Sequence, residues 1–167
     1  MLAACTSSRP LPTVDEVALD RYAGTWYDLA HLPQSFQKGC KCVTADYSQE
    51  NGYVKVINTC VNQESGKTNE VKGKAFPVEG TGNSQLKVQF FWPFKGDYYI
   101  IALEDNYSYA LVGSPDRESL WILSRRPEPA ALLMKEYLNK AEELGFDTSK
   151  LEYTDQSCHA EPIQKNS

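Results

Sequence analysis

The chain has 167 residues, a length that suits one domain able to bury its own core. Hydrophobic residues form 41% and charged residues 23% of the sequence, which excludes a disordered or fibrous protein. The net charge of −5 would repel a phosphate backbone, so nucleic acid is not expected as a partner. We therefore expect a single globular domain.

The N-terminus carries a candidate lipidation site. Leu2-Ala3-Ala4-Cys5 is similar to a bacterial lipobox, in which the leader is cleaved before a cysteine that then carries lipid. The charged and apolar parts of a leader are missing, so either the sequence begins near the cleavage point or the match is accidental. We adopt the first interpretation, in which 1–18 are a lipobox remnant and tether and Cys5 is a membrane anchor.

Eight short strand-like runs, bounded by turn residues, follow the tether. Asn51-Gly52, between the second and third runs, is the strongest hairpin signal because both residues tolerate a positive φ. In the fourth and fifth runs, polar side chains alternate with small or apolar ones, which is typical of strands with one wet face. The runs are 25–32, 42–49, 53–61, 68–78, 85–92, 97–104, 107–113 and 120–125. This order predicts an antiparallel barrel or sandwich.

From Pro129 the apolar spacing changes to that of a helix, over about 129–144. Pro129 suits a first helical turn, and Gly145 suits the position just past the end. One stripe of the helix is apolar and consists of Leu133, Tyr137, Leu138, Ala141 and Leu144. Because the other face mixes lysines and glutamates, we expect the helix to pack on the outside of the barrel.

Four cysteines remain once Cys5 is set aside, and an even number favours two disulfides in an oxidising compartment. They are Cys40, Cys42, Cys60 and Cys158. A zinc site with His159 as an added ligand is the rival interpretation, but structural zinc prefers a wider C-x₂₋₄-C pair. We therefore expect no metal and no other cofactor.

Two motifs resemble those of the lipocalin family. Gly24-Thr25-Trp26-Tyr27 begins the first run, and Trp121-Ile122-Leu123-Ser124-Arg125 lies on the last. Residues 102–112 are similar to the family's second motif, and the resemblance extends from about Leu19 to Cys158. Within the family the chain is similar to the bacterial outer-membrane lipocalins and to apolipoprotein D.

The resemblance implies an all-β fold, an eight-stranded antiparallel up-and-down barrel over 19–158, with the helix outside and 159–167 as a tail. It also implies that Arg125 lies over Trp26 beside Gly24 at the narrow end, as a structural contact.

The implied function is to bind, store or transport a small hydrophobic ligand, a fatty acid or lysophospholipid, in the barrel interior at the cell envelope. With Cys5 as an anchor, the protein would be a bacterial outer-membrane lipoprotein with its domain in the periplasm. The alternative is a soluble protein that is secreted or lies in an organelle lumen, because the cysteine set is similar to that of plastid-type lipocalins.

The candidate ligand site consists of inward-facing residues from the wide half of the barrel. Arg125 must reach inward to Trp26, and strand alternation then places Trp121 inside as well. Three polar members of the set, two tyrosines and an asparagine, would orient a head group while the rings bury the tail. The set is Trp121, Tyr47, Val56, Asn58, Val88, Phe90, Trp92 and Tyr109. The alternative is that these side chains fill a solid core.

An enzyme is not expected, because His31 and His159 have no evident nucleophile partner. Two alternatives stay open: a lipocalin-type isomerase that uses a free Cys60 thiol, and a structural envelope lipoprotein whose barrel is filled. If the apolar tip Trp92-Pro93-Phe94 is exposed, it favours a homodimer or a membrane contact.

Two disulfide pairings are compatible with the sequence. If Glu50 pairs with Tyr53 across the hairpin turn, Cys60 falls one position from facing Cys42, which favours Cys42–Cys60 with Cys40–Cys158. Similarity to apolipoprotein D implies Cys42–Cys158 instead, with Cys40–Cys60. We favour the first pairing.

Overall fold

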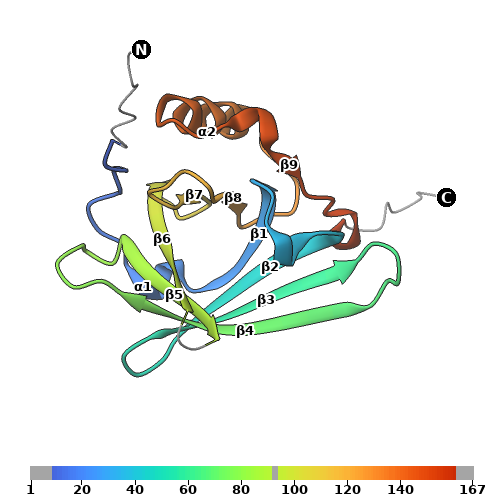
Figure 1. Ribbon diagram of the computed structural model, residues 1–167, viewed down its shortest axis with the longest axis horizontal. Helices are drawn as coiled ribbons and strands as arrows, with labels where there is room; N and C mark the ends of the chain where they lie inside the picture. The colour runs from blue at the N-terminus through green and yellow to red at the C-terminus, as the bar shows by residue number, and fades with distance from the viewer. Residues whose placement is uncertain (1–8, 92–93, 161–167) are drawn as a thin grey trace, which may run out of the picture.

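Eight antiparallel strands close into a barrel in the computed structural model, which describes residues 9–91 and 94–160 (Figure 1). Each strand pairs with its neighbour along the chain, and β1 closes the barrel by pairing with both β8 and β2. The strands are β1 (Gly24–His31), β2 (Cys40–Gln49), β3 (Val54–Asn62), β4 (Thr68–Pro77), β5 (Gln85–Phe91), β6 (Phe94–Leu103), β7 (Tyr109–Gly113) and β8 (Leu120–Ser124). The predicted barrel is confirmed, and each predicted run overlaps one strand.

Shorter elements complete the chain. The helices are α1 (Leu19–Tyr22) and α2 (Ala131–Glu143), and the 3₁₀ turns are η1 (Ser35–Gln37), η2 (Thr148–Lys150) and η3 (Ser157–His159). A two-residue strand, β9 (Glu152–Tyr153), pairs with the end of β1. Within residues 9–91 and 94–160, no helix has the length and apolar character required to cross a bilayer.

The two ends of the barrel differ. At the end where β1 begins, which we call the base, the segment before α1 packs on the β4–β5 turn through a hydrogen bond from the Val17 N–H to the Gly82 carbonyl at 2.8 Å. An ideal Cβ at Gly82 would lie 2.1 Å from the Asp15 carbonyl oxygen, so this approach requires glycine. At the opposite end, the mouth, the long β3–β4 hairpin extends to the right in Figure 1.

The barrel wall separates two hydrophobic clusters. The inner cluster includes Trp26, Val56 and Ile100, and α2 covers the outside of the barrel over β7 and β8 (Figure 1). Met134, Tyr137 and Ala141 of the helix pack there in the outer cluster, with Leu111 and Ile122 from the strands beneath. The predicted helix therefore packs outside the barrel, as expected.

Helix α2 ends where the sequence predicts. Gly145 has a φ of 93°, its N–H bonds to the Glu142 carbonyl, and the Phe146 N–H bonds to the Ala141 carbonyl. Glycine reaches this left-handed conformation without a steric penalty.

The disulfides correct the pairing that we favoured from the sequence. Cys40 bonds to Cys60 with a Cα–Cα distance of 5.5 Å, and Cys42 bonds to Cys158 with a distance of 5.9 Å. The favoured pairing, Cys42–Cys60 with Cys40–Cys158, is therefore wrong. The alternative that similarity to apolipoprotein D implied is the one observed.

A β-bulge explains the correction. The β2–β3 register runs regularly from Gln49 to Thr44 and then shifts before Lys41, so one extra residue enters β2 at Cys42 and Val43. Cys42 has a φ of 54° and donates its N–H to the Asp155 carbonyl at 2.7 Å. The bulge therefore turns Cys42 away from the β2–β3 ladder toward the C-terminal segment.

Candidate functional site

Arg125 closes the base of the barrel over Trp26. The indole is fully buried, and the guanidinium carbon lies 3.9 Å from the ring centroid. The guanidinium also donates hydrogen bonds of 2.8–3.2 Å to main-chain carbonyls of Arg21, Tyr22, Ala23, Thr25 and Tyr107. This contact ties β8 to α1 and to the start of β1, which is a structural task.

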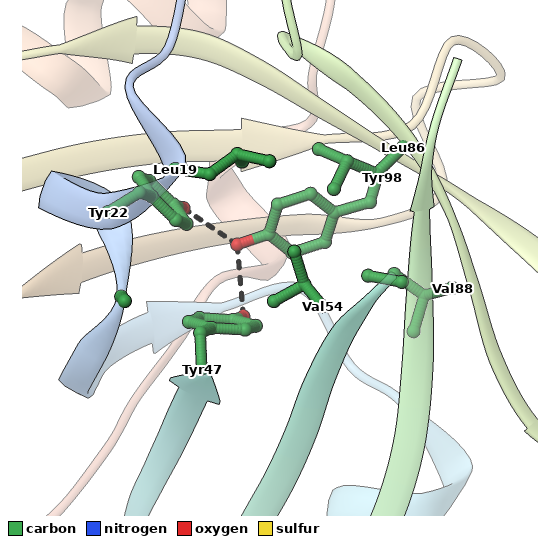
Figure 2. Close-up of a pocket in the computed structure, with 9 residues that line it drawn as sticks. Leu19, Tyr22, Tyr47, Val54, Leu86, Val88 and Tyr98 are labelled. Carbon is green, nitrogen blue, oxygen red and sulfur yellow. Dashed lines mark hydrogen bonds between the residues drawn. The ribbon is translucent and has the colours of Figure 1, made fainter. Parts of the chain in front are cut away.

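Three tyrosine hydroxyls meet just inside the base, and we call Tyr22, Tyr47 and Tyr98 the tyrosine cluster (Figure 2). The Tyr98 hydroxyl lies 2.7 Å from that of Tyr22 and 3.0 Å from that of Tyr47. Apolar side chains from α1 and the strands surround the cluster: Leu19, Ala23, Val54, Ala75, Leu86 and Val88. The cavity between them has a volume of about 10 Å³, enough for one water molecule.

Burial keeps the tyrosine cluster protonated. Desolvation raises the pKa of Tyr47 to about 12, although the hydrogen bond from Tyr98 opposes part of this effect. Desolvation also raises the pKa of Tyr22 and of Tyr98. All three hydroxyls are therefore hydrogen-bond donors at neutral pH.

Nearer the mouth, the inner surface is open to solvent. Strand register places Ala45, Asn58 and Val71 in one inward-facing row across β2, β3 and β4. Asn58 is half-buried, and Val71 is 50% exposed although it lies on the face that points inward. The described side chains therefore fill the base of the barrel but leave apolar surface accessible near the mouth.

Phe90 lies between these two regions. Its ring packs on Gly73 of the neighbouring strand, where an ideal Cβ would lie 2.6 Å from the ring. Gly73 belongs to the same inward row as Tyr47 and Val56. A glycine on β4 thus gives the Phe90 ring its place inside the barrel.

Trp121 lies on the inner wall near the mouth. It is half-buried, packs against the inner cluster and pairs with His31 of β1 and Val112 of β7. Its indole N–H donates to the Gln37 side-chain oxygen at 3.0 Å, which joins the wall to the 3₁₀ turn η1. Phe36, next to Gln37, is 60% exposed.

A buried carboxylate organises this side of the mouth. Asp28 is 3% exposed and accepts hydrogen bonds from the Gln37 amide at 2.8 Å and the Thr154 hydroxyl at 3.1 Å. Oδ2, the oxygen that accepts from Gln37, also lies 3.0 Å from Nδ1 of His31. The Gln156 amide nitrogen donates to the carbonyls of Asp28 and Val43. The C-terminal segment therefore completes the wall between β1 and β2.

His31 carries charge-sensitive contacts in this network. Burial lowers the pKa of His31, but the hydrogen bond to Asp28 and the negative charges of Asp28 and Glu152 outweigh burial, so the pKa lies above its ordinary value. Nε2 of His31 is 3.5 Å from the Glu152 carboxylate on β9. Protonation of His31 thus strengthens the attachment of β9 to β1.

Tyr109 does not belong to the barrel interior and corrects our prediction. It is buried in the outer cluster, its ring lies 6.0 Å from that of Tyr137 on α2, and its hydroxyl accepts a hydrogen bond from the Ala130 N–H. Its neighbours Ala110 and Val112 face inward instead. The 114–119 turn sets the β7–β8 register, which fixes the face of every β7 side chain.

The other candidates divide into three groups. Tyr47, Val56, Val88, Phe90 and Trp121 lie in or against the inner cluster, and Asn58 lies in the same inward rows. Trp92 and Cys5 lie outside the described residues, as does part of the apolar tip considered for a homodimer. Cys60 is bonded to Cys40. Among residues 9–91 and 94–160, no group of three potential ligands is placed to hold a metal ion.

Sequence reasoning missed four polar residues of this interior: Tyr22, Tyr98, Asp28 and Gln37. Tyr98 could have been predicted, because strand alternation puts it on the same face of β6 as the inward-facing Ile100. The same alternation puts Asp28 on the face of β1 that carries Trp26, but its partner Thr154 is 126 residues away in sequence, so this contact has no local signal.

The chain matches the family model described as a lipocalin-like domain over residues 17–156. It is 41% identical over 145 residues to the outer membrane lipoprotein Blc of Vibrio cholerae, covering 86% of this chain and 85% of that protein. It is 32% identical over 166 residues to apolipoprotein D of Macaca fascicularis, covering 93% of this chain and 84% of that protein. Among solved structures, lobster apocrustacyanin A1 superposes with a TM-score of 0.67 at 22% identity, covering 88% of this chain and 91% of that structure. The chain therefore belongs to the lipocalin family.

Proposed function

We propose that this lipocalin binds a fatty acid or lysophospholipid inside its barrel and stores or carries it at the outer membrane, without catalysing a reaction. Lipocalins are generally proteins that bind and transport small hydrophobic ligands. The observation that carries the proposal is the exposed inward face near the mouth. Val71 is 50% exposed there, beside the half-buried Asn58, on a surface that a filled barrel would cover.

The rival functions find less support in the described residues. An isomerase of the kind considered above needs a free thiol in the barrel, and Cys60 is held in a disulfide with Cys40. A filled structural barrel is favoured at the base, where the cavity holds about one water, but not at the mouth. Binding of a ligand that enters through the mouth is therefore the better proposal.

Two matched variants test ligand binding. Val71→Glu places a charge on the inward face, whereas Leu132→Glu places the same charge on α2, at a site that is 70% exposed. Wild type and both variants are titrated with oleate and with an oleoyl lysophospholipid, and binding is followed by tryptophan fluorescence and by native mass spectrometry. We expect Val71→Glu to weaken binding at least tenfold and Leu132→Glu to leave it unchanged, because only the first charge must be desolvated by the acyl chain.

Three outcomes would contradict the proposal. Wild type that takes up neither lipid supports the filled barrel. Equal weakening in both variants places the lipid elsewhere than the interior. Turnover of a bound lipid, detected as a change in its mass or, for an isomerisation, in its chromatographic retention, supports an enzyme.

The outer-membrane location rests on two separate lines of support. Leu2-Ala3-Ala4-Cys5 is similar to a lipobox, and the relative from V. cholerae carries the name outer membrane lipoprotein. With a lipoprotein leader added, the protein should incorporate labelled palmitate and fractionate with outer membranes, and Cys5→Ala should abolish both. A Cys5→Ala variant that keeps the label and the membrane fraction would contradict anchoring through Cys5.

A further inference from the structure

The tyrosine cluster has one more hydroxyl hydrogen than its own hydrogen bonds use. Tyr22, Tyr47 and Tyr98 carry one such hydrogen each, and the two contacts centred on Tyr98 use two of them in whichever direction they run. The other side chains around the adjoining cavity are apolar. A buried donor without an acceptor is unfavourable, so this cavity suits one acceptor oxygen.

Positive charge lies at the same end of the barrel. The Arg125 guanidinium covers Trp26, and the Trp26 ring centroid lies 5.0 Å from that of Tyr22 in the tyrosine cluster. The guanidinium is permanently charged and only partly screened by solvent. Its charge lowers the pKa of Tyr22 and Tyr47, whereas the carboxylates of Asp28 and Asp46 raise the pKa of Tyr47.

The mouth has the opposite character on the β1 side. Asp28 and Glu152 flank His31, so this group is net negative whether His31 is neutral or protonated. Of the cations nearby, Lys38 is exposed and Lys41 interacts with Asp155. A carboxylate held at this side of the mouth would meet negative charge.

The donors near Trp121 are also in use. The Trp121 indole N–H donates to Gln37, and the Gln37 amide donates to Asp28. A carboxylate beside Trp121 would have to break one of these bonds. The hydrogen bonds thus favour the base over the mouth as the place for a carboxylate, because the tyrosine cluster offers a spare donor.

We infer that a fatty acid binds carboxylate-first, with a carboxylate oxygen accepting a hydrogen bond from the tyrosine cluster and the methyl end beside Trp121. The inference rests on the proposed function and specifies the ligand as an acyl chain that ends in a carboxylate. Between its carboxylate and its methyl end, the acyl chain of the ligand passes Val88 and Phe90. The Phe90 ring must therefore move away from Gly73 as the ligand enters.

Two tryptophans report the orientation directly. Trp26 marks the base and Trp121 marks the mouth. The Trp26 indole N–H donates to the Tyr22 carbonyl, and the Trp121 indole N–H donates to the Gln37 side chain. Wild-type protein with isotope-labelled tryptophan is mixed with stearate spin-labelled next to the carboxylate or near the methyl end, and broadening of the indole N–H signals is measured. We expect the carboxyl-end label to broaden Trp26 and the methyl-end label to broaden Trp121.

The outcomes separate this inference from the proposed function. The reverse pattern, or equal broadening of both indoles by both labels, overturns carboxylate-first binding while leaving lipid binding intact. No broadening by either label means that no fatty acid enters the barrel, and the proposed function itself fails.

A variant tests the acceptor site. Tyr98→Phe removes the central hydroxyl, and Tyr53→Phe is the matched control, because the Tyr53 ring packs on Phe76 away from the cluster. We expect Tyr98→Phe to weaken binding of oleate about tenfold and of methyl oleate by less than about twofold, since only the carboxylate makes a charge-assisted hydrogen bond. If Tyr98→Phe weakens binding of both lipids equally, the Tyr98 hydroxyl has only a packing role. If it weakens binding of neither lipid, the carboxylate does not bind at the tyrosine cluster. Either result overturns the inference. Thermal unfolding checks that each variant is folded.

Discussion

Removal of the Cys42–Cys158 disulfide should destabilise the protein more than removal of Cys40–Cys60. The cysteines of the first bond are 116 residues apart and those of the second 20. A cross-link restricts the unfolded chain more when its loop is longer, which gives about 4.8 kcal/mol for the first bond and about 3.3 kcal/mol for the second at 25 °C. Cys42 is also buried, whereas Cys40 is half-buried, so packing acts in the same direction.

The comparison uses two double variants, Cys42→Ala/Cys158→Ala and Cys40→Ala/Cys60→Ala, both in a Cys5→Ala background. Urea unfolding at 25 °C without reductant gives the free energy of unfolding, and we expect the first variant to be the less stable by about 1.5 kcal/mol. Equal losses, or a larger loss in the second variant, would refute the loop-length reasoning. Two thiols reactive toward a thiol reagent in either folded variant would refute the disulfide pairing.

Three further predictions concern the interior. Gly73→Ala should destabilise the fold by about 1–3 kcal/mol in urea unfolding, because the added methyl meets the Phe90 ring. Gly96→Ala is the control and should change stability little, because nothing lies within 4 Å of its new Cβ. Equal effects of the two substitutions would contradict the contact between Gly73 and Phe90. Because folding raises the pKa of His31, the protonated ring stabilises the fold below its ordinary pKa of 6.5, and this stabilisation is lost as the pH rises through the raised value. His31→Gln should therefore cost more stability at about pH 5.5 than at about pH 9, and a pH-independent difference would count against the Asp28 and Glu152 contacts. Folding also raises the pKa of Tyr47 from 10.0 to about 12, so the protonated hydroxyl stabilises the fold below pH 10.0 and this stabilisation is lost as the pH rises through about 12. Tyr47→Phe should therefore shift the midpoint of alkaline unfolding, followed by tyrosinate absorbance, to higher pH. An unchanged midpoint would contradict the raised pKa of Tyr47.

The sequence by itself determined the strands, the helix and the contact that closes the base. Strand alternation and turn residues act over a few neighbouring positions, so runs such as Thr68–Pro77 and the glycine stop of α2 at Gly145 can be read locally. Trp26 and Arg125 were paired through motif similarity, and the structure places the guanidinium over the indole. The inward position of Trp121 followed from that pair by alternation alone.

Tertiary structure alone decided the features that depend on register and on distant segments. One extra residue at the Cys42 bulge reversed the favoured disulfide pairing, and the β7–β8 register turned Tyr109 outward under α2. A shift of one residue moves a side chain to the opposite face of a sheet, and no local pattern records where such a shift occurs. The contacts of Asp28 with Thr154 likewise form only when the C-terminal segment returns to β1, because the partners are distant in sequence and meet only in the closed barrel.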